Sequence, residues 1–302
     1  MKDFNEMLAT VRGPIPDILD APWAILKAKL EEIHDVYQAH LDGRPLDLSQ
    51  YPRPAGTRQA DTGDQAYQVV DGVAVIPVQG TIARRMNLFM QFSGGTSTEL
   101  LQRDFLAAMD DPAVQAILLA VDSPGGLVGG TTTLAESIYA ARGMKPIVAH
   151  AADMMASAAY WIASAADYII AEDASVVGSI GVISMHTDRS AADAKAGIKR
   201  TFITAGKYKA LGNDAEPLSM EAMQEISARL DYIYTLFVDT VARNRGTDQN
   251  TVLKKMADGK TFIGKQARDA GLVDSIGTIE DALVQALSMI RTDQPSYLIR
   301  RR

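Results

Sequence analysis

The sequence predicts an α/β protein whose strands are mostly parallel. Short apolar runs recur at 73–78, 116–120, 146–150 and 168–171, and segments with helical periodicity separate them. Strands that alternate with helices pair in parallel through right-handed crossovers. Beyond residue 204 the chain becomes mainly helical. We therefore expect stacked βαβ units followed by a helical C-terminal part.

The helices are predicted from apolar residues spaced three and four positions apart. Ser97 or Thr98 can cap the first helix after the linker, because a side-chain hydroxyl accepts a hydrogen bond from a free backbone N–H group of the first turn. The longest helix carries apolar residues from Met223 to Val241, which predicts one buried stripe. The expected helices lie at 97–109, 130–141, from Ser157 onward, 221–244, 249–256, 265–270 and 279–290.

The first fifty residues are predicted to form a helical arm. Apolar residues between Trp23 and Tyr37 recur near helical spacing, with lysine and glutamate between them. Two prolines and two glycines among polar residues then indicate a linker. The resulting organisation is an arm at 1–50, a linker at 51–66, a main domain at 67–290 and a C-terminal tail at 291–302.

Composition excludes several classes of function. The 302 residues include no cysteine, which excludes disulfides, thiolate nucleophiles and cysteine metal sites and fits a reducing cytoplasm. The net charge of −7 argues against a protein that coats nucleic acid. No stretch of about 18 uncharged apolar residues is present to span a bilayer, and the N-terminus lacks the apolar core of a secretory signal. We expect a cytoplasmic protein without a membrane anchor.

Two segments carry the residues expected for catalysis. Ser157 stands among small residues at the start of an apolar run, and the segment Gly-Lys-Tyr-Lys follows at 206–209. Serine alone is a poor nucleophile, because its hydroxyl gives up a proton only to a positioned base. A lysine can be that base when burial among apolar groups lowers its pKa. Together the two segments predict a Ser-Lys hydrolase, with Lys207 and Lys209 as candidate bases.

A third motif, Asp-Ser-Pro-Gly-Gly at 122–126, follows the predicted strand at 116–120. A strand that ends in a double-glycine turn can direct backbone N–H groups at a developing oxyanion. Gly125 or Gly126, together with the backbone N–H of Ala158, are therefore the expected oxyanion donors. A glycine pair is also what a tight turn with positive φ needs, so the structural and catalytic interpretations coincide there.

These motifs, together with Gly-Ser-Ile-Gly-Val at 178–182, occur in the order and at roughly the spacings of the signal peptide peptidase A family. The resemblance covers residues 71–286. It implies the Clp protease/crotonase-like fold of that family and a serine peptidase that needs no cofactor and no metal. In the family the base is the third residue after the glycine, which selects Lys209 over Lys207.

The same resemblance assigns roles to residues near Ser157 and Lys209. Ser179 matches a family serine placed to hydrogen-bond the lysine. The family usually has glycines after the nucleophile, where this chain has Ala158 and Ala159. Alanine still leaves room for a substrate backbone, so the departure does not remove Ser157 as the expected nucleophile.

The apolar segment at 22–26 and the missing anchor resemble the phage and prophage members, including the head-maturation proteases of lambdoid phages. That resemblance implies an endopeptidase that cleaves scaffold or capsid-protein segments during capsid assembly. In the family, the serine and the lysine meet across a boundary between protomers or duplicated halves. This chain has one copy of each motif, so we expect a homo-oligomeric ring.

Other interpretations stay open at this stage. A Ser-His-Asp triad can be drawn with His186 and either Asp188 or Asp193, and His150 lies seven residues before the serine. The crotonase fold also serves acyl-CoA enzymes, in which backbone N–H groups hold a thioester enolate and no serine is needed. Further alternatives are a bacterial cytoplasmic enzyme of the same family that degrades peptides, and an inactive shell protein that retains the fold.

Overall fold

The computed structural model describes residues 21–41, 67–85 and 95–292. They fall into two compact units, each described by itself below. The smaller unit includes Ser184–Arg229, and the larger one comprises Trp23–Ile183 and the chain from Leu230 onward. The predicted linker at 51–66 and nearly all of the predicted tail lie outside the described residues. Within the described part, no helix is both long and apolar enough to cross a membrane.

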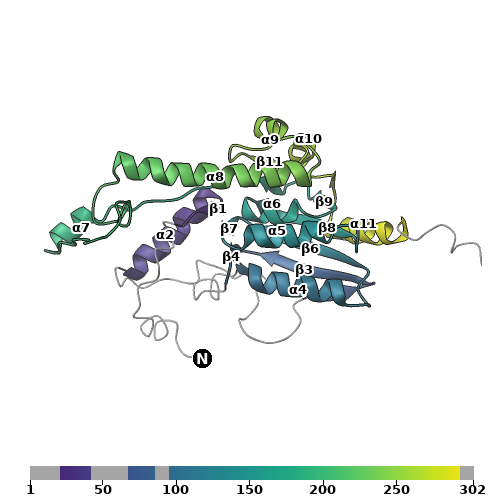
Figure 1. Cartoon of the computed structure of the whole chain (residues 1–302). Coiled ribbons are helices and arrows are strands. Elements are labelled where there is room, and N and C mark those ends of the chain that lie inside the picture. Colours follow the sequence, from purple (N-terminus) through teal and green to yellow (C-terminus); the bar gives the residue numbers. More distant parts are fainter. Residues whose placement is uncertain (1–20, 42–66, 86–94, 293–302) are drawn as a thin grey trace, which may run out of the picture. The chain divides into compact units, whose positions relative to one another are not determined.

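The larger unit is built on an eight-stranded sheet (Figure 1). Its main path runs in the order β11-β10-β8-β6-β3-β2, and β9 pairs with both β8 and β12. The pairs β3–β6, β6–β8, β8–β9 and β8–β10 are all parallel. The strands are β2 (Gln68–Val70), β3 (Val73–Gln79), β6 (Ala116–Ser123), β8 (Ile147–Ala156), β9 (Tyr168–Ala171), β10 (Val176–Gly178), β11 (Thr261–Ile263) and β12 (Ser275–Ile276). The predicted α/β class with mostly parallel strands is confirmed.

A second, four-stranded sheet lies at the end of β6. Its order is β1-β7-β4-β5, formed by β1 (Trp23–Ile25), β7 (Gly125–Leu127), β4 (Thr81–Ala83) and β5 (Gly95–Ser97). The prediction that Trp23 and Ile25 begin a helix is wrong, because the helix α2 starts only at Lys27 (Lys27–Leu41). All three residues of β1 are buried, and the strand pairs with β7 on one edge and with Ile183 on the other. These strand contacts satisfy backbone groups that a helix would have paired internally.

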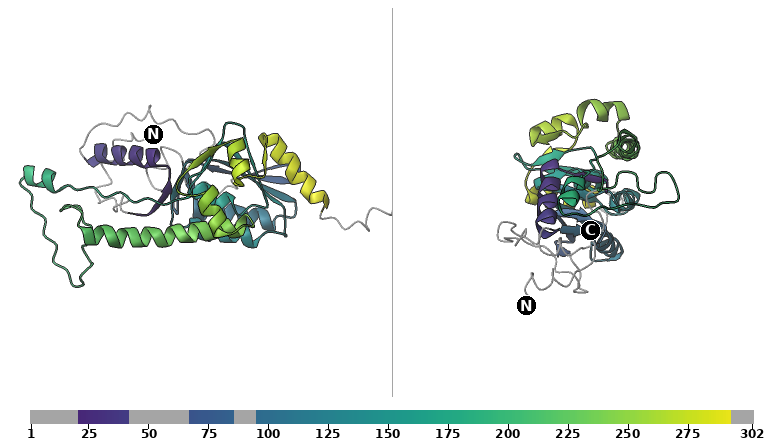
Figure 2. Two further views of the ribbon diagram at one scale, coloured as in Figure 1. Left: turned by 90° about the horizontal axis from the view of Figure 1, so that it is seen from above. Right: turned by 90° about the vertical axis from the view of Figure 1, so that its left-hand side faces the viewer.

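Helices cover both faces of the main sheet. Alternate residues of β6 point to opposite sides, so that Ile117 and Leu119 join one apolar cluster and Leu118 joins another. The second cluster is closed by α11, which lies on the far side of the strands from α8 (Figure 2). Besides α2, the helices of the larger unit are α4 (Thr98–Asp110), α5 (Thr131–Ala140), α6 (Ala158–Ala163), α9 (Gln249–Lys255), α10 (Lys265–Ala270) and α11 (Ile279–Thr292). The helix α7 (Ser190–Lys195) belongs to the smaller unit, and α8 (Met220–Asn244) continues from the smaller unit into the larger one. Ser97 caps α4 as predicted, since its Oγ accepts a hydrogen bond from Leu100 N.

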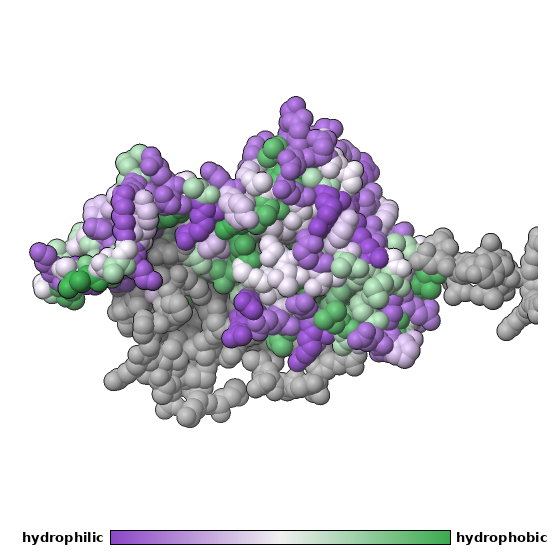
Figure 3. Space-filling model, viewed as in Figure 1, coloured by the Kyte–Doolittle hydropathy of each residue, from purple (hydrophilic) through white to green (hydrophobic). Residues whose placement is uncertain are grey.

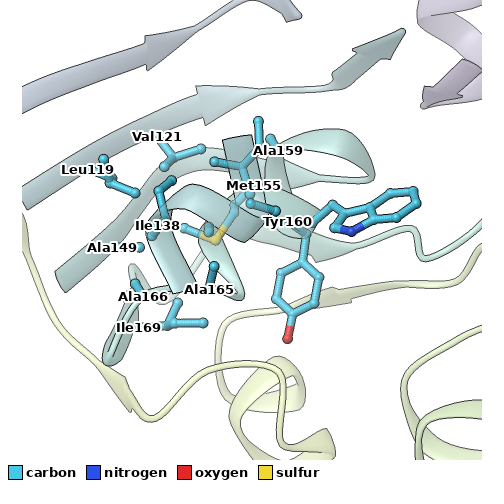
Figure 4. Packing of buried hydrophobic residues seen from close by; sticks show 14 of the residues in the cluster. Leu119, Val121, Ile138, Ala149, Met155, Ala159, Tyr160, Ala165, Ala166 and Ile169 are labelled. Carbon is cyan, nitrogen blue, oxygen red and sulfur yellow. The ribbon is translucent and has the colours of Figure 1, made fainter. Parts of the chain in front are cut away.

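The short helix α6 is the most completely enclosed element of the larger unit. Every one of its residues is buried, and Figure 4 shows Ala159 and Tyr160 packed with residues of β6, β8 and α5. The indole of Trp161 stacks on the Phe237 ring of α8, with centroids 4.1 Å apart. Tyr160 Oη donates a hydrogen bond to the Leu272 carbonyl at 2.9 Å. The residue that precedes α6 is therefore attached to a rigid support.

The long helix α8 differs from its prediction. A buried stripe is present from Phe237 to Val241, but Met223 is 47% exposed, and the predicted stripe residues Ile226, Leu230 and Ile233 are only half-buried. The first half of α8 belongs to the smaller unit and the second half to the larger one. Only the second half packs on the main core, which is why the apolar spacing predicted a longer buried face than the chain has.

Candidate active site

Ser157 occupies a strained turn between β8 and α6. Its backbone angles are φ 55° and ψ −117°, whereas a residue with a side chain rarely adopts a positive φ. The turn is held by two backbone hydrogen bonds, from Ser157 N to the Gly178 carbonyl (2.7 Å) and from Trp161 N to the Ser157 carbonyl (2.8 Å). Strained strand-to-helix turns of this kind present the nucleophile in α/β-hydrolases. The side chain is buried, and its Oγ lies 3.4 Å from the Gly181 carbonyl oxygen, a long contact.

Gly125 and Gly126 lie directly beside this serine, in β7. A Cβ added to Gly125 would stand 3.0 Å from Ser157 Cβ and 2.2 Å from the Ala24 carbonyl oxygen. A Cβ on Gly126 would stand 1.9 Å from the Ile82 carbonyl oxygen. Real Cβ atoms do not approach so closely, so both positions require glycine for packing. Gly125 also has a φ of 100°, as the sequence predicted for this turn.

The backbone N–H groups of the two glycines differ. Gly125 N donates to Ser123 Oγ at 3.2 Å, and Ser123 Oγ donates in turn to the Gly80 carbonyl at 2.6 Å. Gly126 instead pairs with Ala24 of β1. Ala158 is the first residue of α6, where backbone N–H groups have no partner within the helix. Of the candidate oxyanion donors, Gly125 therefore has its N–H engaged inside its own turn.

Ser179 lies next to the serine turn. It follows Gly178, whose carbonyl accepts the hydrogen bond from Ser157 N, and its own N–H donates to the Lys260 carbonyl at 2.7 Å. Its φ of 54° is a second strained non-glycine angle, and its side chain is largely buried. Two neighbouring positive φ angles are typical of a functional site. The lysine-orienting role of Ser179 remains a prediction.

The lysine motif belongs to the smaller unit. Lys207 forms an ion pair with Glu221, with Nζ and Oε1 2.6 Å apart, and this hydrogen bond raises the pKa of Lys207. Lys209 is exposed, its N–H closes a turn on the Gly206 carbonyl, and it forms no ion pair with a described residue. The structure thus gathers Ser157, Ala158, Gly125, Gly126 and Ser179 in the larger unit, and places Lys209 in the smaller one.

The acids of the alternative triad have other partners. In the smaller unit, Asp188 accepts a hydrogen bond from Ser190 N, and Asp193 pairs with Arg200 at 2.7 Å. His186 Nε2 is buried without a hydrogen-bond partner among the described residues. In the larger unit, His150 Nε2 lies 3.3 Å from the Gly277 carbonyl oxygen, and burial lowers the pKa of His150. Glu172 Oε1 lies 3.8 Å from His150 Nε2, beyond hydrogen-bond distance. Within the described residues, neither histidine therefore has the hydrogen-bonded carboxylate that orients a catalytic histidine.

One element of the site, the strand β1, was not predicted from the sequence. It lies along the glycine strand β7, and Trp23 exchanges two backbone hydrogen bonds of 2.8 Å with Ile183. A three-residue apolar run fits a helix as well as a strand, so no local pattern indicated this pairing. Ile183 follows the motif at 178–182 by one residue, and its part in the site could be found only from the structure.

Comparisons with known proteins show the family of this chain. Residues 140–289 match the model of peptidase family S49. "Putative protease slr0021" of Synechocystis sp. is 31% identical over 221 residues, which cover 73% of this chain and 75% of that protein. The chain belongs to peptidase family S49. Its matched segment contains Ser157, Ser179 and the lysine motif.

A phage protein and a solved structure are also similar to this S49 chain, the first in sequence and the second in fold. "Capsid assembly protease C" of Escherichia phage lambda is 35% identical over 228 residues, which cover 76% of this chain and 51% of that protein. This chain thus spans about half the length of that relative. Among solved structures, an enoyl-CoA hydratase/isomerase family member is similar with 18% identity and a TM-score of 0.39, covering 75% of this chain and 74% of that one. At that score the likeness carries no argument about chemistry.

Proposed function

We propose that this S49 chain is a serine endopeptidase in which Ser157 is the nucleophile and Lys209 the general base. The observation that carries the proposal is the strained turn at Ser157 beside the glycine strand, in a member of a peptidase family. Ser157 Oγ attacks the scissile carbonyl carbon while Lys209 takes the hydroxyl proton. The lysine passes that proton to the leaving amine, and water then hydrolyses the acyl-enzyme.

The oxyanion of the tetrahedral intermediate is assigned to two backbone N–H groups, those of Gly126 and Ala158. Gly126 is preferred to Gly125 because the N–H of Gly125 is bonded to Ser123 Oγ within its own turn, whereas the N–H of Gly126 is directed at the neighbouring strand β1. Ala158 follows the nucleophile directly and starts α6. In serine peptidases, loss of one such donor lowers kcat about 10²- to 10³-fold.

Lys209 is preferred to its neighbour Lys207 on electrostatic grounds. A general base must be able to lose its proton, and the ion pair with Glu221 stabilises the protonated form of Lys207. Lys209 has no carboxylate partner among the described residues. The family motif points to the same lysine, and it assigns Ser179 the role of orienting it.

The smaller unit supports a homo-oligomer. Ala222 is the only buried residue between 184 and 229, while Ile203 is 97% exposed. Hydrophobic residues are visible on the surface of this part in Figure 3. The exposed large apolar side chains are Ile198, Phe202, Ile203, Tyr208, Met220 and Met223. A group of this size without a core of its own is typical of an interaction surface, and we propose that other copies cover it in a closed ring.

The proposed substrates are scaffold or capsid-protein segments in an assembling phage head. The similarity to the phage lambda protein supports this role. This chain covers 75% of the Synechocystis protein and 51% of the phage lambda protein. Co-expression with a candidate scaffold protein tests it. We expect truncated scaffold in the presence of the wild-type enzyme and intact scaffold with Ser157→Ala. Intact scaffold in both cases, with the enzyme active on other substrates, would contradict the phage role.

The peptidase activity is tested by cleavage of an unfolded protein such as reduced casein. Ser157→Ala should lower the rate by about 10³-fold or more. The remaining activity would come from substrate binding and from the backbone N–H groups that bind the oxyanion. Ser164→Ala is the matched control, because Ser164 is a buried serine at the other end of α6 whose Oγ donates to the Trp161 carbonyl. The control should keep most of its activity per folded molecule. Equal rates for Ser157→Ala and wild type would refute the proposal.

A further inference from the structure

The strand β1 is paired on both of its edges, with β7 on one side and with Ile183 on the other. It runs antiparallel to the glycine strand β7, with Ala24 opposite Gly126 and Ile25 opposite Gly125. On its other edge, Trp23 exchanges two backbone hydrogen bonds with Ile183. Extended peptides are commonly bound in this way, as an added strand held by main-chain hydrogen bonds.

The carbonyl of Ala24 is the backbone group of β1 that faces the serine. A Cβ built on Gly125 would lie 2.2 Å from Ala24 O and 3.0 Å from Ser157 Cβ. The Ala24 carbonyl oxygen and Ser157 Cβ are therefore close neighbours, since their separation cannot exceed the sum of the two distances. The Ala24 side chain is fully buried, so the site holds a small residue there.

The hydrogen-bond pattern of the strands orients the same carbonyl. In an antiparallel pair, bonded and non-bonded residue pairs alternate. Leu26 N donates to the Pro124 carbonyl at 3.1 Å, so the next bonded pair along the strands is Ala24 with Gly126. Ala24 O therefore faces the N–H of Gly126, the donor assigned above to the oxyanion.

We propose that the bond between Ala24 and Ile25 is a self-cleavage site of this protein. The inference rests on the proposed function, with Ser157 as nucleophile. Ser157 Oγ forms a bond to the Ala24 carbonyl carbon, and the bond from that carbon to Ile25 N breaks. The hydroxyl proton passes through the general base to Ile25 N, which leaves as a free amine. Water then hydrolyses the acyl-enzyme, restores the Ser157 hydroxyl and releases residues 1–24 with a carboxylate at Ala24.

Self-cleavage would also open the site to other substrates. Before the cut, β1 fills the space between β7 and Ile183 and covers the serine. After it, Trp23 and Ala24 belong to a separate peptide, and these two residues pair with β7 and Ile183 without a covalent link to the rest of the chain. Such a peptide can dissociate, and the groove then accepts another extended chain.

The test follows the full-length protein by intact mass and N-terminal sequencing during incubation, alongside cleavage of added casein. We expect the wild type to yield a chain that begins at Ile25, with a first-order rate constant that does not change with protein concentration once the oligomer is fully assembled. Ser157→Ala should stay uncut at this bond. The peptide bond between Ala116 and Ile117 joins the same two residues within β6 and is an internal control that should stay intact.

Ile25→Pro is the variant designed to block self-cleavage without disturbing the pairing of β1 with β7. Ile25 and Gly125 form a non-bonded pair by the same alternation, so proline at this position removes no hydrogen bond to β7, but it blocks cleavage at its own N-side amide. This variant should keep residues 1–24 attached. A wild-type chain that stays full length while it cleaves casein through Ser157 would overturn self-cleavage and leave the proposed function standing. Loss of both reactions in wild type would overturn both. A rate constant that still rises with protein concentration after the oligomer is fully assembled would contradict cleavage of a β1 strand by the serine of its own chain.

Discussion

Replacing Lys209 with alanine is expected to abolish peptide cleavage as completely as Ser157→Ala does. The serine hydroxyl cannot release its proton without a base, so removal of either member should cost about 10³-fold or more in kcat. The double variant should lose no further activity, because members of one catalytic unit are not additive. Steady-state rates on a fluorogenic peptide measure all three variants.

Two matched controls accompany this experiment. Lys207→Ala removes the neighbouring lysine, which is held by Glu221, and should keep most of the activity. His186→Ala removes the histidine of the alternative triad and should also stay active. An active Lys209→Ala together with an inactive His186→Ala would overturn the lysine assignment in favour of a histidine base.

The second large effect is expected when two inactive variants are mixed. If the serine and the lysine of one site come from different subunits, a ring that contains both Ser157→Ala and Lys209→Ala subunits has some interfaces with an intact pair. Activity should then return to a substantial fraction of the wild-type level, from a baseline near zero. The measurement is the cleavage rate after subunit exchange, which a mass shift of the mixed oligomer verifies.

A variant in the exposed apolar group is the control for oligomerisation. Ile203→Asp places a charge at a side chain that is 97% exposed, so it should not disturb folding of the chain. It should weaken ring assembly and the rescue together. A mixture that stays inactive after proven exchange, or a monomer that cleaves at the full rate, would contradict the shared site.

Much of the fold could be predicted because its signals are local. The four parallel strands at 73–78, 116–120, 146–150 and 168–171 are apolar runs, and the helices around them repeat every three to four residues. The capping role of Ser97 was also predictable, since it depends on the first turn of one helix. These features are decided by neighbours in sequence.

The errors arose where distant segments decide the structure. Trp23 and Ile25 form a strand because Gly126 and Ile183, more than a hundred residues away, supply its partners. Met223 and Ile226 share the apolar spacing of α8, but Met223 is exposed and Ile226 is only half-buried, so periodicity alone overstated the buried stripe. Pairing between remote strands and the reach of a core leave little trace in a short window of sequence.

The candidate site was predictable in part. Ser157 and the glycine motif stood out by their small neighbours, and the structure places them side by side. The choice between Lys207 and Lys209 came from the family resemblance, and the ion pair of Lys207 now gives it a physical reason. The engagement of Gly125 N by Ser123 could not be read from the sequence, because it depends on how the turn is folded.

The central claim is that Ser157 attacks the substrate, and trapping the acyl-enzyme tests it most directly. The enzyme would be mixed with an activated ester of a peptide ending in alanine, quenched with acid during turnover, digested and analysed by mass spectrometry. The acyl group should be found on Ser157 in the wild type, and no acylated peptide should form in Ser157→Ala. Turnover with the acyl group on another side chain, or without any acyl group on Ser157, would contradict the account.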